Sequence, residues 1–114
     1  MAHRIEQGEG YAVVHLDGDV DLSNSPAARK LIMSALQKPQ SVLVDLSGVS
    51  YIDSSGIANL VEGYQLARQL GVDFALLGVS PAASKVLGLA RLDEVFTQYR
   101  ALEDWLAKAQ PTDA

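Results

Sequence analysis

The segment Asp53–Gly56, which reads Asp-Ser-Ser-Gly, places two adjacent hydroxyl groups beside a carboxylate. It follows an apolar run at 42–46 and precedes apolar residues with helical spacing, so we predict that Ser54 stands at the amino terminus of a helix over 54–70. The free N–H groups and the macrodipole of a helix start favour an anion, and they would partly accommodate a phosphate on Ser54. From its position alone, the commoner role of such a serine is that of a helix N-cap.

A second acidic segment, Gly18–Asp21, follows a predicted strand at 11–16. If the two strands are parallel, both segments lie at the same edge of the sheet, which is where sites form in open α/β sheets. Asp21 could then approach Ser54, although a solvated turn aspartate is the commoner case. Asp53 is expected either to accept hydrogen bonds from turn amides or to orient the neighbouring hydroxyl.

The residues that an enzyme would need are not arranged for catalysis. A serine nucleophile requires a base, and the two histidines, His3 and His15, fall on early strand positions, where His15 fits a half-exposed structural role. Ile52 stands where a Gly-x-Ser-x-Gly elbow has its first glycine, and no glycine-rich phosphate loop is present. Aspartates 45, 53 and 73 are too scattered to predict a metal site. We therefore expect no enzymatic activity, no metal and no cofactor.

The spacing of glycine, proline and apolar residues predicts the elements that position these groups. Ser25-Pro26 favours a helix start, with Ser25 as the N-cap, and Pro39 ends that helix. Gly71 stands where a glycine commonly terminates a helix. The other predicted elements are strands at 3–7, 73–78 and 95–99, a helix from Ser80-Pro81 to about Leu87, and a terminal helix around 102–109. The resulting order, β-β-α-β-α-β-α-β-α, predicts an α/β fold with a single mostly parallel sheet and about four packed helices.

Length and charge limit the classes of partner. The 114 residues suit one domain, and the absence of cysteine excludes a disulfide scaffold and a thiolate metal site. The formal net charge of −5 argues against nucleic acid as a partner. Neither a secretory signal nor an apolar run of membrane-spanning length is visible, so we expect a cytoplasmic protein with no membrane insertion.

The stretch 42–57, Val-Leu-Val-Asp-Leu-Ser-Gly-Val-Ser-Tyr-Ile-Asp-Ser-Ser-Gly-Ile, resembles the signature of the STAS domain, found in anti-sigma factor antagonists and in sulfate transporter tails. Gly18–Asp21 is similar to a turn of that family, Val79–Pro81 to the entry of its third helix, and Leu87–Phe96 to its passage into the last strand. The resemblance covers roughly residues 5–108. It implies a single STAS domain over residues 1–114.

The resemblance implies a partner switch rather than catalysis. In the family, the serine after the motif aspartate is phosphorylated by an anti-sigma factor that is itself a serine kinase of the GHKL type, and this serine corresponds to Ser54. The unphosphorylated antagonist binds the anti-sigma factor and frees a sigma factor, while a phosphatase resets the phosphorylated form. Such switching serves transcription regulation in bacterial stress responses. The partner-binding residues that the resemblance implies are Asp19, Asp21, Asp53, Ser54, Ser55, Gly56 and Asn59.

Three of these residues carry more specific expectations. Gly56 is expected to let the backbone of the partner come close. Asp19 stands where the family usually has glutamate, and Asn59, one helical turn from Ser54, is expected to alter partner choice.

A second hypothesis from the same resemblance is a non-regulatory STAS subunit of an ABC-type lipid transport complex. In such a complex the domain braces an ATPase, and the acceptor hydroxyl need not be modified. The identity of the sigma factor, kinase and phosphatase, the upstream signal and the oligomeric state are not specified by the sequence.

Overall fold

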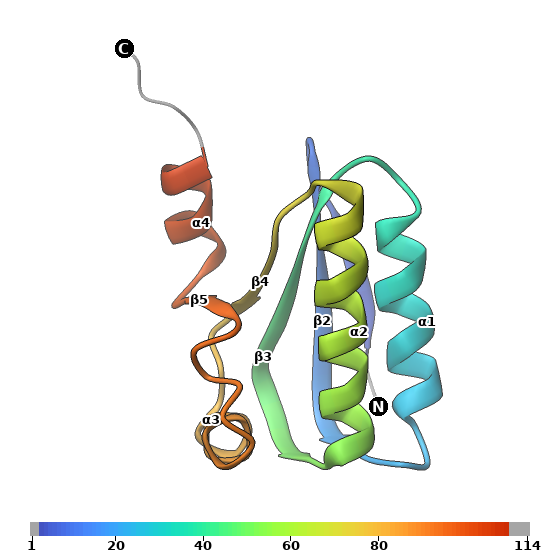
Figure 1. Ribbon diagram of the computed structural model, residues 1–114, viewed down its shortest axis with the longest axis vertical. Coiled ribbons are helices and arrows are strands. Elements are labelled where there is room, and N and C mark those ends of the chain that lie inside the picture. Colours follow the sequence, from blue (N-terminus) through green and yellow to red (C-terminus); the bar gives the residue numbers. More distant parts are fainter. Residues whose placement is uncertain (1–2, 110–114) are drawn as a thin grey trace.

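The computed structural model describes residues 3–109; the ends of the expected domain, residues 1–2 and 110–114, lie outside the described residues. The strands form one five-stranded sheet in the order β1-β2-β3-β4-β5 (Figure 1). The pair β1–β2 is antiparallel and the other neighbouring pairs are parallel. The strands are β1 (Arg4–Gln7), β2 (Tyr11–Val20), β3 (Ser41–Ile52), β4 (Phe74–Leu77) and β5 (Thr97–Tyr99), and the helices are α1 (Ser25–Leu36), α2 (Ser54–Leu70), α3 (Pro81–Leu89) and α4 (Leu102–Ala109).

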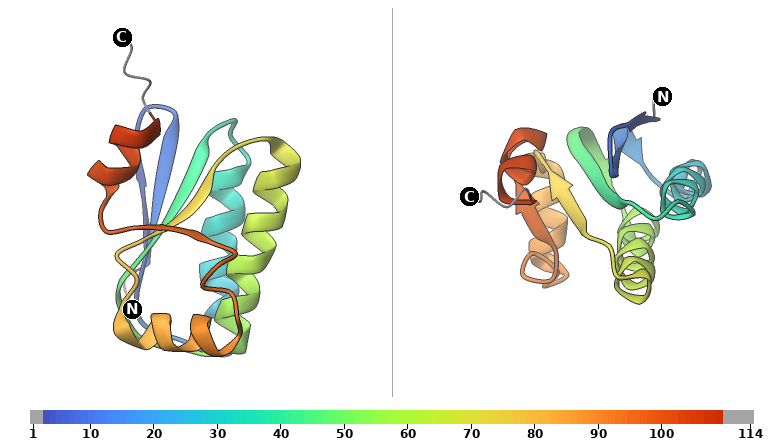
Figure 2. Two further views of the ribbon diagram at one scale, coloured as in Figure 1. Left: turned by 60° about the vertical axis from the view of Figure 1, so that its left-hand side comes forward. Right: turned by 90° about the horizontal axis from the view of Figure 1, so that it is seen from above.

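This arrangement confirms the predicted α/β fold and its element order. Helices α1 and α2 lie side by side on one face of the sheet, α3 covers the same face across one end, and α4 lies on the opposite face (Figures 1 and 2). Consecutive strand residues point to opposite faces, so β2 and β3 contribute apolar side chains to both layers.

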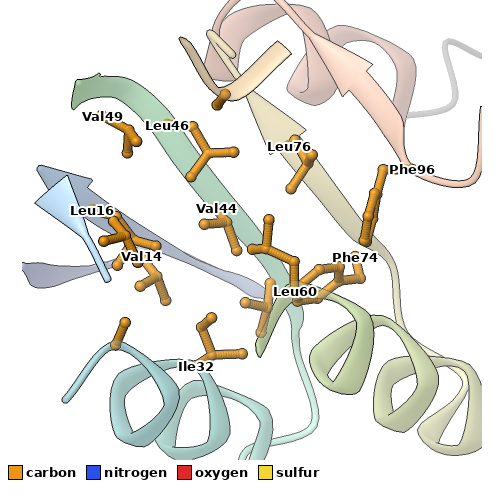
Figure 3. Packing of buried hydrophobic residues seen from close by; sticks show 14 of the residues in the cluster. Val14, Leu16, Ile32, Val44, Leu46, Val49, Leu60, Phe74, Leu76 and Phe96 are labelled. Atoms are coloured by element: carbon orange, nitrogen blue, oxygen red, sulfur yellow. The ribbon is translucent and has the colours of Figure 1, made fainter. Parts of the chain in front are cut away.

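The larger core fills the space between the sheet and the helices α1, α2 and α3. Val14, Val44 and Leu76 extend from three neighbouring strands toward Ile32 of α1 and Leu60 of α2 (Figure 3). All five of these side chains are fully buried. A smaller cluster on the opposite face packs Trp105 of α4 against apolar residues of β2, β3 and β4.

Both long strands extend further than the apolar runs predicted. The expected strands at 11–16 and 42–46 continue to Val20 and Ile52, which pair with one another. Two register shifts, between His15 and Asp17 and between Gly18 and Asp19, let polar residues enter the ladder without breaking it. The apolar pattern stops at these irregularities, which is why it predicts shorter strands.

The helix ends follow the expected chemistry with one correction. Gly71 ends α2 in the left-handed conformation, at φ 74°, and the Ser80 side chain caps α3 by accepting from the Ala83 N–H at 3.2 Å. Ser25, however, is not the N-cap of α1, which is Asn24. The Asp21 carbonyl already accepts the N–H groups of Asn24 and Ser25, so the turn that starts the helix closes one residue earlier than the Ser-Pro pair suggests.

Within residues 3–109, no helix combines the length and the apolar character that crossing a membrane requires.

Candidate functional site

The site lies at the edge where the carboxyl ends of β2 and β3 meet the start of α2. Val20 pairs with Ile52 in the parallel ladder, and the Asp53 N–H donates to the Val20 carbonyl at 3.1 Å. The turn after β2 is joined to the same point, because the Leu22 N–H donates to Asp53 Oδ2 at 3.1 Å. The structure therefore places the two acidic segments side by side, as the parallel strands predict.

Asp53, and not Ser54, is the N-cap of α2. Its Oδ1 accepts from the backbone N–H groups of Ser55 at 2.9 Å and Gly56 at 3.3 Å, and from the Ser55 hydroxyl at 2.5 Å. The Ser55 hydroxyl, together with the N–H groups of Gly56, Ser55 and Leu22, holds the pKa of Asp53 below its ordinary value against the opposing effect of burial. The carboxylate thus satisfies the turn amides and binds the hydroxyl of Ser55, not that of the adjacent Ser54.

The two adjacent serines differ in their exposure and in the hydrogen bonding of their hydroxyls. Ser54 is the first residue of α2 and its side chain is exposed. In the described part of the chain, the Ser54 hydroxyl has no hydrogen-bond partner, whereas the Ser55 hydroxyl is half-buried and bound to Asp53. Of the two adjacent serines, Ser54 is the one whose oxygen is accessible to another protein.

Asp21 lies near the site but turns its carboxylate into its own loop. Its Oδ1 accepts from the Ser23 N–H at 3.0 Å and the Ser23 hydroxyl at 2.6 Å. Asp21 therefore has the turn role, and no hydrogen bond joins it to Ser54 among residues 3–109. Asp19 is exposed and accepts from the Ser50 hydroxyl of β3 at 3.0 Å.

Two of the expected partner-binding residues are instead buried within the fold. A Cβ at Gly56 would come within 2.7 Å of Ile52 Cγ1 and 2.8 Å of Val20 Cγ1, so the glycine allows α2 to pack closely on the ends of its own strands. Close approach of a partner's backbone at Gly56 stays a prediction. Asn59 donates its amide to the Ser25 carbonyl at 2.8 Å and is only 7% exposed. Asn59 therefore joins α2 to α1 and does not present its side chain at the surface.

Two apolar side chains beside the site are exposed, which the sequence did not predict. Leu22, next to Asp21, is 76% exposed, and Tyr51, which pairs with Asp19 at the end of β3, is 51% exposed. For Leu22 the sequence offers one signal, which is a leucine directly between an aspartate and a serine in a polar turn.

A second group of titratable side chains lies on the opposite face of the sheet. His15 bridges two carboxylates, with Nδ1 at 2.7 Å from Asp45 Oδ2 and Nε2 at 2.9 Å from Glu6 Oε1. They line part of a hollow of about 350 Å³ between β2, β3 and the start of α4. Burial raises the pKa of Asp45, but hydrogen bonds from Ser47 and His15 outweigh it and hold the pKa below its ordinary value.

The side chains of this second group are bound to one another. Both ring nitrogens of His15 already contact carboxylates, so no serine hydroxyl is paired with them as a nucleophile. Within the part of the chain that the structure describes, no three histidine, aspartate or glutamate side chains gather in a way that could hold a metal ion. Asp73, the remaining aspartate considered, accepts from the Trp105 indole at 3.4 Å and lies apart from Asp45 and Asp53.

Comparison with known proteins adds evidence independent of this geometry. The model of the STAS domain family matches residues 3–105. The anti-sigma F factor antagonist of Paenibacillus polymyxa is 27% identical over 97 residues, which cover 83% of each chain.

Solved structures give the same picture. The crystal structure of an anti-sigma factor antagonist from Mycobacterium paratuberculosis superposes with a TM-score of 0.84 at 26% identity, covering 96% of this chain and 94% of the other. The anti-sigma factor antagonist SpoIIAA in its unphosphorylated form has a TM-score of 0.82 at 19% identity, with 99% and 100% coverage, and so shows the shared fold.

Proposed function

This chain belongs to the STAS domain family, and we propose that it is an anti-sigma factor antagonist that is switched off by phosphorylation of Ser54. The unphosphorylated protein would bind an anti-sigma factor and so release a sigma factor. The kinase would be the anti-sigma factor itself, an enzyme of the GHKL type, and a phosphatase would restore the binding form. The proposal places the protein in the cytoplasm, as a single domain without catalytic residues.

One observation carries the assignment of the acceptor. At the start of α2 the exposed Ser54 hydroxyl is accessible, while the adjacent Ser55 hydroxyl is held by Asp53 at 2.5 Å. A kinase that reaches this edge therefore meets an unengaged oxygen at Ser54 and an engaged one at Ser55. The relatives that match over most of the chain and are named as antagonists supply the class of partner.

The charge of a phosphate gives the switch its physical basis. Phosphorylation adds a charge of about −1.5 to −2 at this edge. The amides that a helix start normally offers to an anion are partly occupied here, since Asp53 already accepts the N–H groups of Ser55 and Gly56. At roughly 6 Å and an effective dielectric constant near 20, such a charge and one carboxylate repel by about 4–5 kcal/mol before salt screening. Even about 1.4 kcal/mol at the interface changes partner affinity tenfold, so the switch needs no change of fold.

Binding measurements on three variants test the proposal. Each anti-sigma factor of the source genome is purified, and its affinity for the wild-type protein is measured by calorimetry. Ser54→Ala should bind as tightly as the unphosphorylated wild type, Ser54→Asp should bind at least tenfold more weakly, and the matched control Ser55→Ala should resemble wild type.

Equal affinities of Ser54→Ala and Ser54→Asp would contradict the proposed switch. Stable co-purification with a transport ATPase, together with an unmodified Ser54, would replace it by the transport-subunit hypothesis.

A further inference from the structure

The two most exposed large apolar side chains of the described residues both lie at the end of the molecule that carries Ser54. Leu22 is 76% exposed in the turn between β2 and α1, and Leu89 is 77% exposed as the last residue of α3. We propose that this leucine pair, Leu22 and Leu89, forms the apolar contacts that hold the anti-sigma factor on either side of Ser54. The inference rests on the proposed function and adds the residues that supply affinity apart from the phosphorylation site.

The arrangement of the elements places the pair on the two sides of the start of α2. At the lower end of Figure 1, α3, the end of β3, the start of α2 and the connection from β2 to α1 follow one another in that order. The view from above in Figure 2 shows the same order, with α2 between α3 and α1. A partner that covers Ser54 is therefore flanked by α3 on one side and by the turn that carries Leu22 on the other.

Leu22 is exposed but its backbone is fixed. Its N–H donates to Asp53 Oδ2, and the Asp21 carbonyl on its amino-terminal side accepts from Asn24 at 3.0 Å and Ser25 at 2.7 Å. The Asn24 side chain also closes the turn, accepting from the Asp21 N–H and donating to the Asp19 carbonyl. A leucine presented by a rigid turn loses little conformational entropy when a partner covers it.

Leu89 is presented in the same way by the end of α3. The Leu92 N–H donates to the Leu87 carbonyl at 2.8 Å and the Arg91 N–H to the Gly88 carbonyl at 3.1 Å, a closed helix terminus. Arg91 adopts a left-handed backbone, at φ 60°, which side chains other than glycine rarely do. The fold thus accepts local strain to hold this exposed corner in one shape.

Gly88 provides a separate indication that another chain approaches here. Apart from its chain neighbours and the nearby backbone of α3 itself, a Cβ at Gly88 would meet no atom within 4 Å, and Gly88, the penultimate residue of α3, has no positive φ. Glycine is a poor helix former, and nothing in the described structure requires it at this position. Close approach of a partner's backbone beside Leu89 would explain it.

The charges around the pair indicate what kind of partner fits. Asp19 and Asp21 lie beside Leu22, and Asp93 and Glu94 follow Leu89 along the chain, with the exposed Arg91 as the one basic residue between Leu89 and Glu94. The net charge of the whole protein is also negative, at −5, which disfavours a second copy as the occupant. The surface is therefore complementary to an anti-sigma factor that offers two apolar pockets with basic residues at their rims.

Charged substitutions at exposed leucines test the inference, and α2 offers a matched control. Leu70, at the opposite end of α2, is 51% exposed and lies far from Ser54 along the helix. Leu22→Asp, Leu89→Asp and Leu70→Asp are each made in the Ser54→Ala background, so that phosphorylation cannot contribute, and each is titrated with the purified anti-sigma factors. The free energy gained on burying a leucine is large enough that Leu22→Asp and Leu89→Asp should each weaken binding at least tenfold. Leu70→Asp should change the affinity less than twofold.

Gly88→Ala adds a readout that a folding defect cannot imitate. The alanine should raise the thermal midpoint of the free protein by a few degrees and weaken partner binding several-fold. A Gly88→Ala protein that binds like its parent, or Leu22→Asp and Leu89→Asp proteins that bind like Leu70→Asp, would overturn the inference while leaving the switch at Ser54 intact. Failure of the Ser54→Ala protein to bind any of the anti-sigma factors would overturn the proposed function itself. Effects of the two leucine substitutions on self-association alone would also overturn the inference, in favour of a dimer interface.

Discussion

Asp45, within β3, and Asp53, directly after it, both accept several hydrogen bonds, yet their neighbours differ. On the face of the sheet that carries α4, Asp45 binds His15, and the other ring nitrogen of His15 contacts Glu6, so each of the three groups has a partner. At the edge of the sheet, Asp53 satisfies the start of α2 and the turn after β2, and beside it the Ser54 hydroxyl has no partner among residues 3–109. Asp53 therefore holds two backbone segments beside an accessible hydroxyl, whereas the groups of the His15 network are bound to one another.

Replacing a glycine by alanine should give the largest difference in stability between the two regions. Gly56 tests the Asp53 edge and Gly48 tests the region of the His15 network. At Gly56 a Cβ meets two packed branched side chains, Ile52 and Val20, and we expect Gly56→Ala to destabilise the fold by about 1–3 kcal/mol. Gly48 lies near the His15 network, where the closest atom to a Cβ is Oδ1 of the exposed Asp17, a side chain that can turn away. Urea unfolding of Gly56→Ala and Gly48→Ala measures the contrast. Equal losses of unfolding free energy would show that the Asp53 edge is no more tightly packed than the region of the His15 network.

Removal of the cap should have the next largest effect. Asp53→Ala deletes the acceptor for the start of α2 and for Leu22, and the thermal midpoint should fall by roughly 5 °C. Asp53→Asn keeps a capping oxygen and should retain most of the stability. His15→Ala should cost less than Asp53→Ala, because the contacts of His15 with Glu6 and Asp45 are partly solvent-exposed. If calorimetry showed a larger fall of the thermal midpoint for His15→Ala than for Asp53→Ala, the order of the two regions would be reversed.

The pH dependence of stability should be the smallest of the three effects. The pKa values of Asp45 and Asp53 both lie below their ordinary values in the folded protein, so each carboxylate stabilises the fold above about pH 4 and loses that contribution as the pH falls through its folded pKa. Asp53→Asn should therefore flatten the decline of stability on acidification. His15→Ala removes a hydrogen bond that lowers the pKa of Asp45, so the folded pKa should move back toward its ordinary value and the decline should become smaller. Urea unfolding between pH 3 and 6 measures both, and unchanged curves would contradict the hydrogen-bond account of the shifts.

Much of the fold follows from local signals in the sequence. The apolar runs, the Gly71 terminus and the Ser80-Pro81 start predict the elements in their observed order. The extensions of β2 to Val20 and of β3 to Ile52 could not be predicted from the apolar pattern. Pairing between the two strands keeps the polar residues of these extensions in a strand conformation.

The site is predictable only in part, for the same reason. Parallel strands bring the segments of Asp21 and Asp53 to one edge, which the element order predicts. That Gly56 and Asn59 are buried, and that Ser55 rather than Ser54 binds Asp53, depends on the packing of α2 against β2, β3 and α1. Contacts between elements distant in sequence leave no signal in a residue's own neighbours.

The central claim is that Ser54, and not Ser55, is the group that is modified. Phosphopeptide mapping of the protein isolated from its own cells, in growth and under stress, tests it directly. The account predicts phosphate on Ser54, with an occupancy that changes with stress, and none on Ser55. Phosphate on Ser55, or a Ser54 that is never phosphorylated under either condition, would contradict it.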